Sequence, residues 1–168
     1  MIRNAIKYGL IIGFGFCVWV NLEHLVGFHT IHLTAGKYSH FFTFIIFLLG
    51  LYFGIREQRD IEYNGYMKYS DALKTGLLIT LFATFFIFGI MYIYAEFINP
   101  DLLDIMVNQT KKPMLDAGKS EVEINLSLQH IYNTYSTTGR VIRQVTETII
   151  SGIIGIFLFP WLLKNKNT

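Results

Sequence analysis

The sequence has very little cysteine and little charge, and each scarcity excludes a class of protein. Among 168 residues there is one cysteine, Cys17. It cannot form an intrachain disulfide and has no partner for a zinc site, so we interpret it as a small apolar packing residue. Only 15% of the residues are charged and the formal net charge is +2. This charge does not indicate a nucleic-acid partner.

Motifs for catalysis and for coupled transport are also missing. The sequence has no Walker loop, no dinucleotide-binding fingerprint and no nucleophile elbow. No set of charged residues lies deep within an apolar stretch, where the coupling site of a transporter usually lies. We therefore predict no catalytic residue, no cofactor and no resident metal ion, and a membrane enzyme is the hypothesis that the residues favour least.

The chain does have long apolar stretches, and hydrophobic residues make up 52% of it. Four stretches cover residues 8–26, 38–55, 75–98 and 144–163. Each has about the 20 residues that a helix needs to cross a bilayer, and none shows the alternation of barrel strands. The predicted fold class is therefore all-α, an integral membrane bundle of four transmembrane helices that forms one domain over residues 1–168.

The segment between the third and fourth predicted spans, residues 99–143, is too long for a simple turn. Apolar residues at helical spacing predict two short helices, over residues 100–110 and 121–132. We expect them to be separated near Pro113 and Gly118. Their apolar faces would then lie on the membrane surface or on the end of the bundle.

Two helix boundaries in this segment carry recognisable chemistry. Ser120 and Glu123 have the spacing of a capping box. Asn99 is interpreted as a helix cap, with Pro100 at the first helical position.

Lysine and arginine predict the orientation of the chain in the membrane. The segments that share a side with the termini hold eight of these residues, and the segments on the other side hold six. The positive-inside rule therefore predicts that the N- and C-termini are cytoplasmic. The eight are Arg3, Lys7, Arg56, Arg59, Lys68, Lys74, Lys164 and Lys166, and the six are Lys37, Lys111, Lys112, Lys119, Arg140 and Arg143.

The order of several short runs resembles one known family. The runs are NAIKYGL at residues 4–10, GIREQR at 54–59, GYMKYSDALKTG at 65–76 and YAEFINPD at 94–101. Together they resemble a family of small bacterial four-helix membrane proteins that is known only as a domain of unknown function. The resemblance covers nearly the whole chain, and its most specific part is the run at 65–76. It implies a bacterial inner-membrane location and brings no activity, substrate or catalytic residue.

Pairs of small residues four positions apart mark one face of three predicted spans. Such pairs let another helix backbone approach closely. They predict helix packing, and the pattern leaves open whether the partner helix belongs to the same chain or to a second copy. The pairs are Gly9 with Gly13, Gly50 with Gly54, and Ser151 with Gly155.

Ionisable residues near the span ends gather on the side opposite the termini. Glu23 and His24 lie near the end of the first span, Glu96 near the end of the third and Glu147 near the start of the fourth. Helix phase turns His24, Glu96 and Glu147 towards the small-residue faces. They predict a polar pocket for a cation, a proton or, with help from loop histidines, a metal. The other histidines on this side are His29, His32, His40 and His130.

A structural explanation of these residues stays open as well. The carboxylates lie close enough to the span ends to reach water, and Arg143 is placed to pair with Glu147. The leading functional hypothesis is therefore a membrane protein that acts by assembly with itself or with another membrane protein. The alternative is a small transporter or channel component that uses the acidic and histidine pocket. The lipid bilayer is the expected partner in both cases, and nucleic acid is not.

Overall fold

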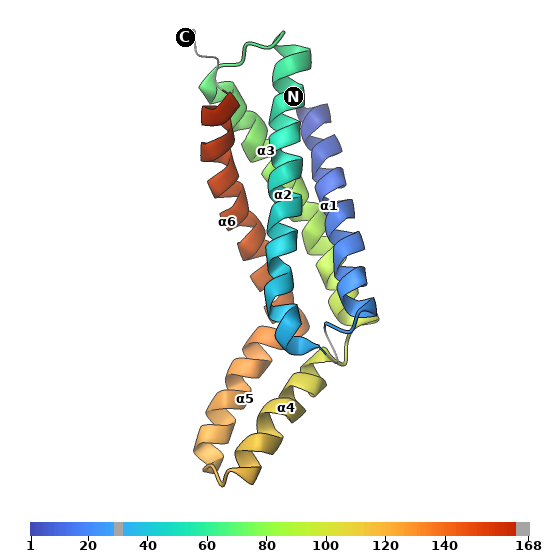
Figure 1. The fold of residues 1–168 in the computed structure, drawn as a ribbon, viewed down its shortest axis with the longest axis vertical. Coiled ribbons are helices and arrows are strands. Elements are labelled where there is room, and N and C mark those ends of the chain that lie inside the picture. The colour runs from blue at the N-terminus through green and yellow to red at the C-terminus, as the bar shows by residue number, and fades with distance from the viewer. Residues whose placement is uncertain (29–31, 164–168) are drawn as a thin grey trace.

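The protein is helical, without strands, over the part of the chain that the structure describes. This computed structural model describes residues 1–28 and 32–163. The elements follow one another in the order drawn in Figure 1. They are α1 (Ile2–Leu25), α2 (Leu33–Glu62), α3 (Tyr69–Ile93), the π-helix η1 (Tyr94–Ile98), α4 (Leu102–Asp116), α5 (Glu121–Tyr135) and α6 (Thr137–Leu163).

Four segments are long and apolar enough to cross a membrane. They are Ile2–Leu25, Phe41–Glu62, Tyr69–Ile98 and Thr137–Leu163. Large apolar side chains such as Phe14, Phe85 and Phe157 are exposed on these segments. So much outward apolar surface suits lipid and not water. The predicted fold class, an all-α bundle of four membrane helices, is confirmed.

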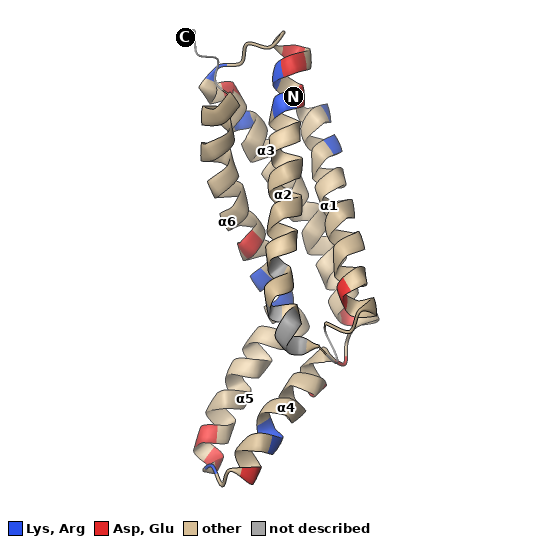
Figure 2. Ribbon diagram, in the orientation of Figure 1, with Lys and Arg blue, Asp and Glu red and all other residues tan. Residues whose placement is uncertain are grey.

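The two ends of the bundle differ in their chemistry. At the end where α1 begins and α6 ends, Lys7 Nζ lies 2.7 Å from Glu57 Oε2. Tyr8 Oη donates to the same carboxylate at 2.7 Å. Figure 2 shows further charged residues at this end, which we name the terminal end. The opposite end carries α4 and α5, and we name it the hairpin end.

Small residues bring the long helices together within one chain. A Cβ added at Gly9 of α1 would lie 2.7 Å from Phe82 Cβ of α3, and one added at Gly13 would lie 2.9 Å from Phe86 Cβ. The other predicted small residues are also enclosed: Gly50 lies against Ile12, Gly54 against Ile79 and Tyr8, and Gly155 against Leu51, while Ser151 is buried. These faces are therefore occupied by neighbouring helices of the same chain.

The connection between the membrane helices is an α-helical hairpin that extends beyond the bundle (Figure 1). Pro113 lies inside α4, which continues to Asp116. The predicted break between the two helices is confirmed, but it falls at Gly118, whose φ is +66°, and not at Pro113. Pro113 is exposed, so water can satisfy the carbonyl that its missing N–H leaves free.

The two predicted caps have opposite outcomes. The capping box is confirmed: Glu123 N donates to Ser120 Oγ at 3.3 Å, and Ser120 N donates to Glu123 Oε2 at 3.1 Å. The interpretation of Asn99 as the cap that begins the following helix, with Pro100 at its first position, is wrong. The N-cap of α4 is Asp101, and the buried Asn99 side chain instead donates from Nδ2 to Tyr94 Oη at 3.2 Å.

The capping box makes the start of α5 sensitive to acid. The hydrogen bonds from Ser120 and the nearby Lys119 ammonium lower the pKa of the Glu123 carboxyl below its ordinary value. A depressed pKa means that the carboxylate stabilises α5 above the ordinary pKa, and that this stabilisation is lost as the pH falls through the depressed value. We expect the protection of the amides in residues 120–126, measured by hydrogen exchange with mass spectrometry and corrected for the intrinsic pH dependence of exchange, to fall at low pH.

The matched control is Glu123→Gln, which keeps the side-chain length and cannot titrate. At each pH its amides in residues 120–126 should show the low protection of the acidified wild type, after correction for the intrinsic rate. A wild type and a Glu123→Gln variant with the same pH response would contradict a role for the carboxylate in the cap.

Candidate functional site

Helix α6 carries a stripe of polar residues on one face. The residues recur at helical spacing, so they lie one above another along the helix. All four are buried, between 3% and 9% exposed. Polar groups at membrane depth are costly unless they face protein or a water-filled cavity. The stripe consists of Arg140, Gln144, Thr148 and Ser151.

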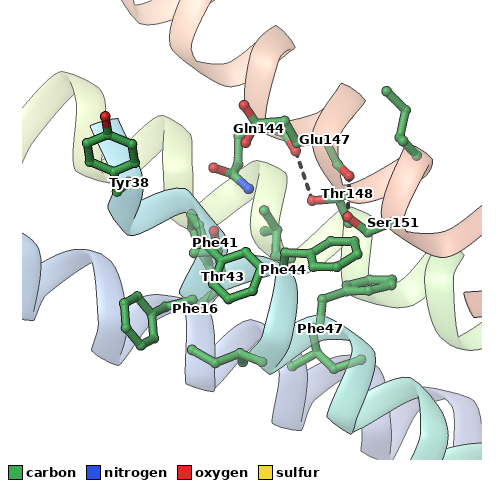
Figure 3. A pocket seen from close by; sticks show the side chains of 15 residues that line it. Phe16, Tyr38, Phe41, Thr43, Phe44, Phe47, Gln144, Glu147, Thr148 and Ser151 are labelled. Atoms are coloured by element: carbon green, nitrogen blue, oxygen red, sulfur yellow. Dashed lines mark hydrogen bonds between the residues drawn. The ribbon is translucent and has the colours of Figure 1, made fainter. Parts of the chain in front are cut away.

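A cavity of about 700 Å³ lies along this stripe. Figure 3 shows Gln144, Glu147, Thr148 and Ser151 on one side of it and a group of aromatic side chains on the other. We name this cavity the aromatic chamber. Its aromatic residues are Phe16 of α1 and Tyr38, Phe41, Phe42, Phe44 and Phe47 of α2. The chamber is therefore apolar on one wall and capable of hydrogen bonding on the other.

A second cavity of about 340 Å³ lies at the hairpin end, and we name it the arginine chamber. Its charged lining residues are Glu23, Arg140 and Arg143. Leu102 and Met106 of α4 also line it, which brings the base of the hairpin into its wall. The two chambers are neighbours because three residues line both of them: Phe16, Thr43 and Gln144.

Arg140 is the most unusual residue of the site. Its side chain is buried, and Nη1 donates to the Asn99 carbonyl oxygen at 2.8 Å. The guanidinium carbon lies 5.4 Å from the centre of the Tyr94 ring, within cation–π range. Nη2 is buried and has no hydrogen-bond partner among the described residues. A buried donor without an acceptor is costly, so this atom is where a ligand would gain most.

The start of α6 fixes the position of Arg140. Ser136 precedes the helix, and its Oγ accepts from Gly139 N at 3.2 Å while its carbonyl oxygen accepts from Arg140 N at 2.9 Å. Glu96 of η1 also contacts this turn: its Oε2 accepts from Thr137 Oγ1 at 2.9 Å. A carboxylate near a helix N-terminus is favourable. Glu96 and Ser136 thus stabilise the turn from which Arg140 projects.

The π-helix η1 supplies the acceptor for Arg140. Asn99 N donates to Tyr94 O at 2.9 Å, across one residue more than in an α-helix. Pro100 follows and disfavours the α-helical conformation at Asn99, which has φ −135° and ψ 61°. The Asn99 carbonyl is thereby free of the helix ladder and accepts from Arg140. Single-turn π-helices are frequent at functional sites.

The four ionisable residues that the sequence predicted to form one pocket do not all line one chamber. Glu23 is buried and lines the arginine chamber, where its carboxylate accepts from Trp19 Nε1. Glu147 lines the aromatic chamber and lies 3.4 Å from Arg143 Nε. His24 and Glu96 line neither chamber. His24 is half-buried and stands edge-on to the Tyr94 ring, 6.0 Å between centroids.

The histidines do not form a metal centre in the part of the chain that the structure describes. There, no group of three or more histidine, cysteine, aspartate or glutamate side chains could hold a metal ion. His32 and His130 are exposed. His29 and the side chain of His40 lie outside the described residues.

A comparison with protein families places the chain. The model of a family described as protein of unknown function, DUF4199, matches residues 7–162. The chain belongs to the DUF4199 family. No curated protein and no solved structure matches it significantly.

The matched part of the DUF4199 chain contains all the residues that line the two chambers. The chambers offer guanidinium, amide, hydroxyl and carboxylate groups beside aromatic rings. Such groups can orient a bound molecule by charge and hydrogen bonds while the rings contact its apolar part.

Arg140 is the site residue that sequence reasoning missed in this DUF4199 chain. An apolar stretch that begins at residue 144 leaves Arg140 outside the predicted membrane span, among the charges of the connecting segment. The signal that finds it is the recurrence of polar residues at helical spacing from Arg140 into that stretch, at Gln144, Thr148 and Ser151.

Proposed function

We propose that this chain is a small membrane transport component that holds a small molecule in the two chambers at its hairpin end. The observation that carries the proposal is the buried Nη2 of Arg140, a donor without an acceptor on the wall of a cavity. Both cavity volumes fall within the roughly 300–1,000 Å³ of ordinary small-molecule sites. The lining also combines many apolar contacts with a few fixed polar groups, as such sites do.

The proposal includes a location and an orientation. We place the chain in a bacterial inner membrane, with the terminal end of the bundle, and therefore both termini, in the cytoplasm. The excess of lysine and arginine on that side supports this orientation. The chambers then lie towards the outer side of the membrane, where a transport component would meet its ligand.

Filling the aromatic chamber should abolish binding. Thr148 is buried on its wall, and Thr148→Phe would place a ring in the cavity. We expect native mass spectra of the protein, extracted gently from its membrane, to show a bound small molecule on the wild type and little or none on Thr148→Phe.

The matched control is Ile149→Phe, one position along α6, where the side chain is exposed to the outside of the bundle. It adds the same ring to the same helix and should retain the bound molecule. A wild type without any bound molecule, or equal occupancy in all three proteins, would contradict the proposal.

A second candidate function is assembly with itself or with another membrane protein. The observation that favours it is a set of exposed apolar residues on the projecting hairpin, where lipid does not cover them if the hairpin stands in water: Leu115, Val122, Leu126 and Tyr132. The small-residue faces are already used within the chain, so the hairpin is the surface we propose. The same native mass spectra report the oligomeric state, and a monomer without partners would contradict assembly.

A further inference from the structure

We infer that the ligand is an amphiphile with an anionic head group, which enters from the bilayer and places its head at Arg140 and its apolar chain in the aromatic chamber. This inference rests on the proposed function and names the class of molecule that the chambers would take. Different residues would hold the head group and the apolar chain of this ligand.

The charge of Arg140 is not neutralised by a carboxylate among the described residues. Its contacts there are the Asn99 carbonyl oxygen and the Tyr94 ring, which are neutral groups. A guanidinium in low dielectric is strongly stabilised by an anion and presents paired donors that match a carboxylate or a phosphate. The free Nη2 therefore indicates an anionic head rather than a neutral or cationic one.

The surroundings of Arg140 support the same sign of charge. Arg140 lies in the first turn of α6, where the helix dipole is positive. Arg143 lines the same chamber and lies 3.4 Å from Glu147 Oε1, so of the two guanidinium groups Arg140 is the one without a carboxylate among the described residues. The Glu23 carboxylate is itself held by the Trp19 indole.

The aromatic chamber supplies room for the apolar part of the ligand. Its walls are mainly aromatic and aliphatic side chains, and Phe16, Thr43 and Gln144 line both it and the arginine chamber. A molecule with its head at Arg140 would reach it past these shared side chains. Gln144 could then hydrogen-bond the head or the neck of the ligand.

The chamber is also open sideways, towards lipid. Tyr38, Phe41 and Phe42 of α2 line it and are 77%, 63% and 51% exposed. Ile150 of α6 lines it as well and is 52% exposed. In a membrane this opening between α2 and α6 faces hydrocarbon, so an amphiphile could enter without crossing water. Because the apolar chain of the ligand would move from one apolar medium to another, the head group must provide most of the binding free energy.

The test compares palmitate with hexadecanol, which share the same alkyl chain and differ in charge, and adds an anionic phospholipid and inorganic phosphate. The purified chain is placed in nanodiscs of zwitterionic phosphatidylcholine, and binding of palmitate, phosphatidylglycerol, hexadecanol and inorganic phosphate is measured by native mass spectrometry. We expect palmitate or phosphatidylglycerol to bind more tightly than hexadecanol. The tighter of the two identifies the source of the anion as a free fatty acid or a phospholipid. This comparison uses only the wild type, so it stands even if a variant fails to fold.

Variants then test whether Arg140 binds the head group of the ligand. Arg140→Gln should weaken the preferred anion roughly thirtyfold, as expected when one partner of a buried charge pair is removed, and leave hexadecanol unchanged. Arg56→Gln is the control, because Arg56 is exposed at the terminal end and lines neither chamber. It should leave every probe unchanged.

The outcomes separate this inference from the proposed function. Equal affinity for hexadecanol and for the anions would contradict the preference for an anionic head group, while the proposed binding of a small molecule would stand. If inorganic phosphate bound as tightly as the amphiphiles, the ligand's apolar chain would have no role in binding. If no probe binds and Thr148→Phe changes nothing, the proposed function itself fails.

Discussion

Replacing Gly139 with alanine is expected to destabilise the junction of α5 and α6. A Cβ at this position would overlap the Asn133 carbonyl oxygen and lie 2.9 Å from the Asn133 carbonyl carbon. These are backbone atoms at the end of α5, so no side-chain rotation can relieve the clash. We expect a loss of about 1–3 kcal/mol, the usual cost of overpacking, in the free energy of unfolding measured in mixed micelles.

The effect should extend to the site, because Gly139 immediately precedes Arg140. A shifted first turn would move the guanidinium away from the Asn99 carbonyl. The control is Gly89→Ala: nothing lies within 4 Å of a Cβ there, and alanine is the better helix former by about 1 kcal/mol. If Gly139→Ala were as stable as Gly89→Ala, the close contact between α5 and α6 would be refuted.

Gly152→Ala is expected to have a comparable effect on the packing of α6 against α3. A Cβ at Gly152 would overlap Thr80 Cγ2 and lie 2.9 Å from Thr80 Oγ1. Thr80 is itself buried, and its Oγ1 has no hydrogen-bond partner among the described residues. The two helices would therefore have to separate, again at a cost of about 1–3 kcal/mol in unfolding free energy.

A double-mutant cycle makes this prediction specific. Thr80→Ala removes both atoms that the new Cβ would meet first, so the combination of Gly152→Ala with Thr80→Ala should recover most of the lost stability. A coupling free energy near zero would show that Gly152 and Thr80 do not touch, because independent sites give additive effects.

The membrane spans could be predicted from the sequence because lipid imposes a simple rule. A stretch of about 20 apolar residues must form a helix to satisfy its own backbone, whatever surrounds it. The partners of the small-residue faces could not be predicted in the same way. The pattern at Gly9 and Gly13 predicts that the backbone of another helix approaches closely. Only the structure shows that this helix is α3 of the same chain.

The site was harder to predict because it depends on side chains from distant parts of the chain. Helix phase turns His24 and Glu147 towards the small-residue faces, yet it carries no information about which helix stands opposite. Arg140 meets Asn99 across 41 positions of sequence, and the meeting depends on a π-helix. The sequence around Asn99 was interpreted as a cap, since a proline after asparagine suits that role equally well.

The π-helix also governs which changes the chain can tolerate between Tyr94 and Ile98. Exchanging one amino acid for another in this stretch keeps the winding of α3 and everything after it. Losing one residue would close this turn as an ordinary α-helical turn of about four residues, so Asn99 would keep nearly the same direction around the helix axis. The five positions thus hold one residue more than an α-helical turn needs, and the loss of one would leave the elements that follow on the same face of the bundle.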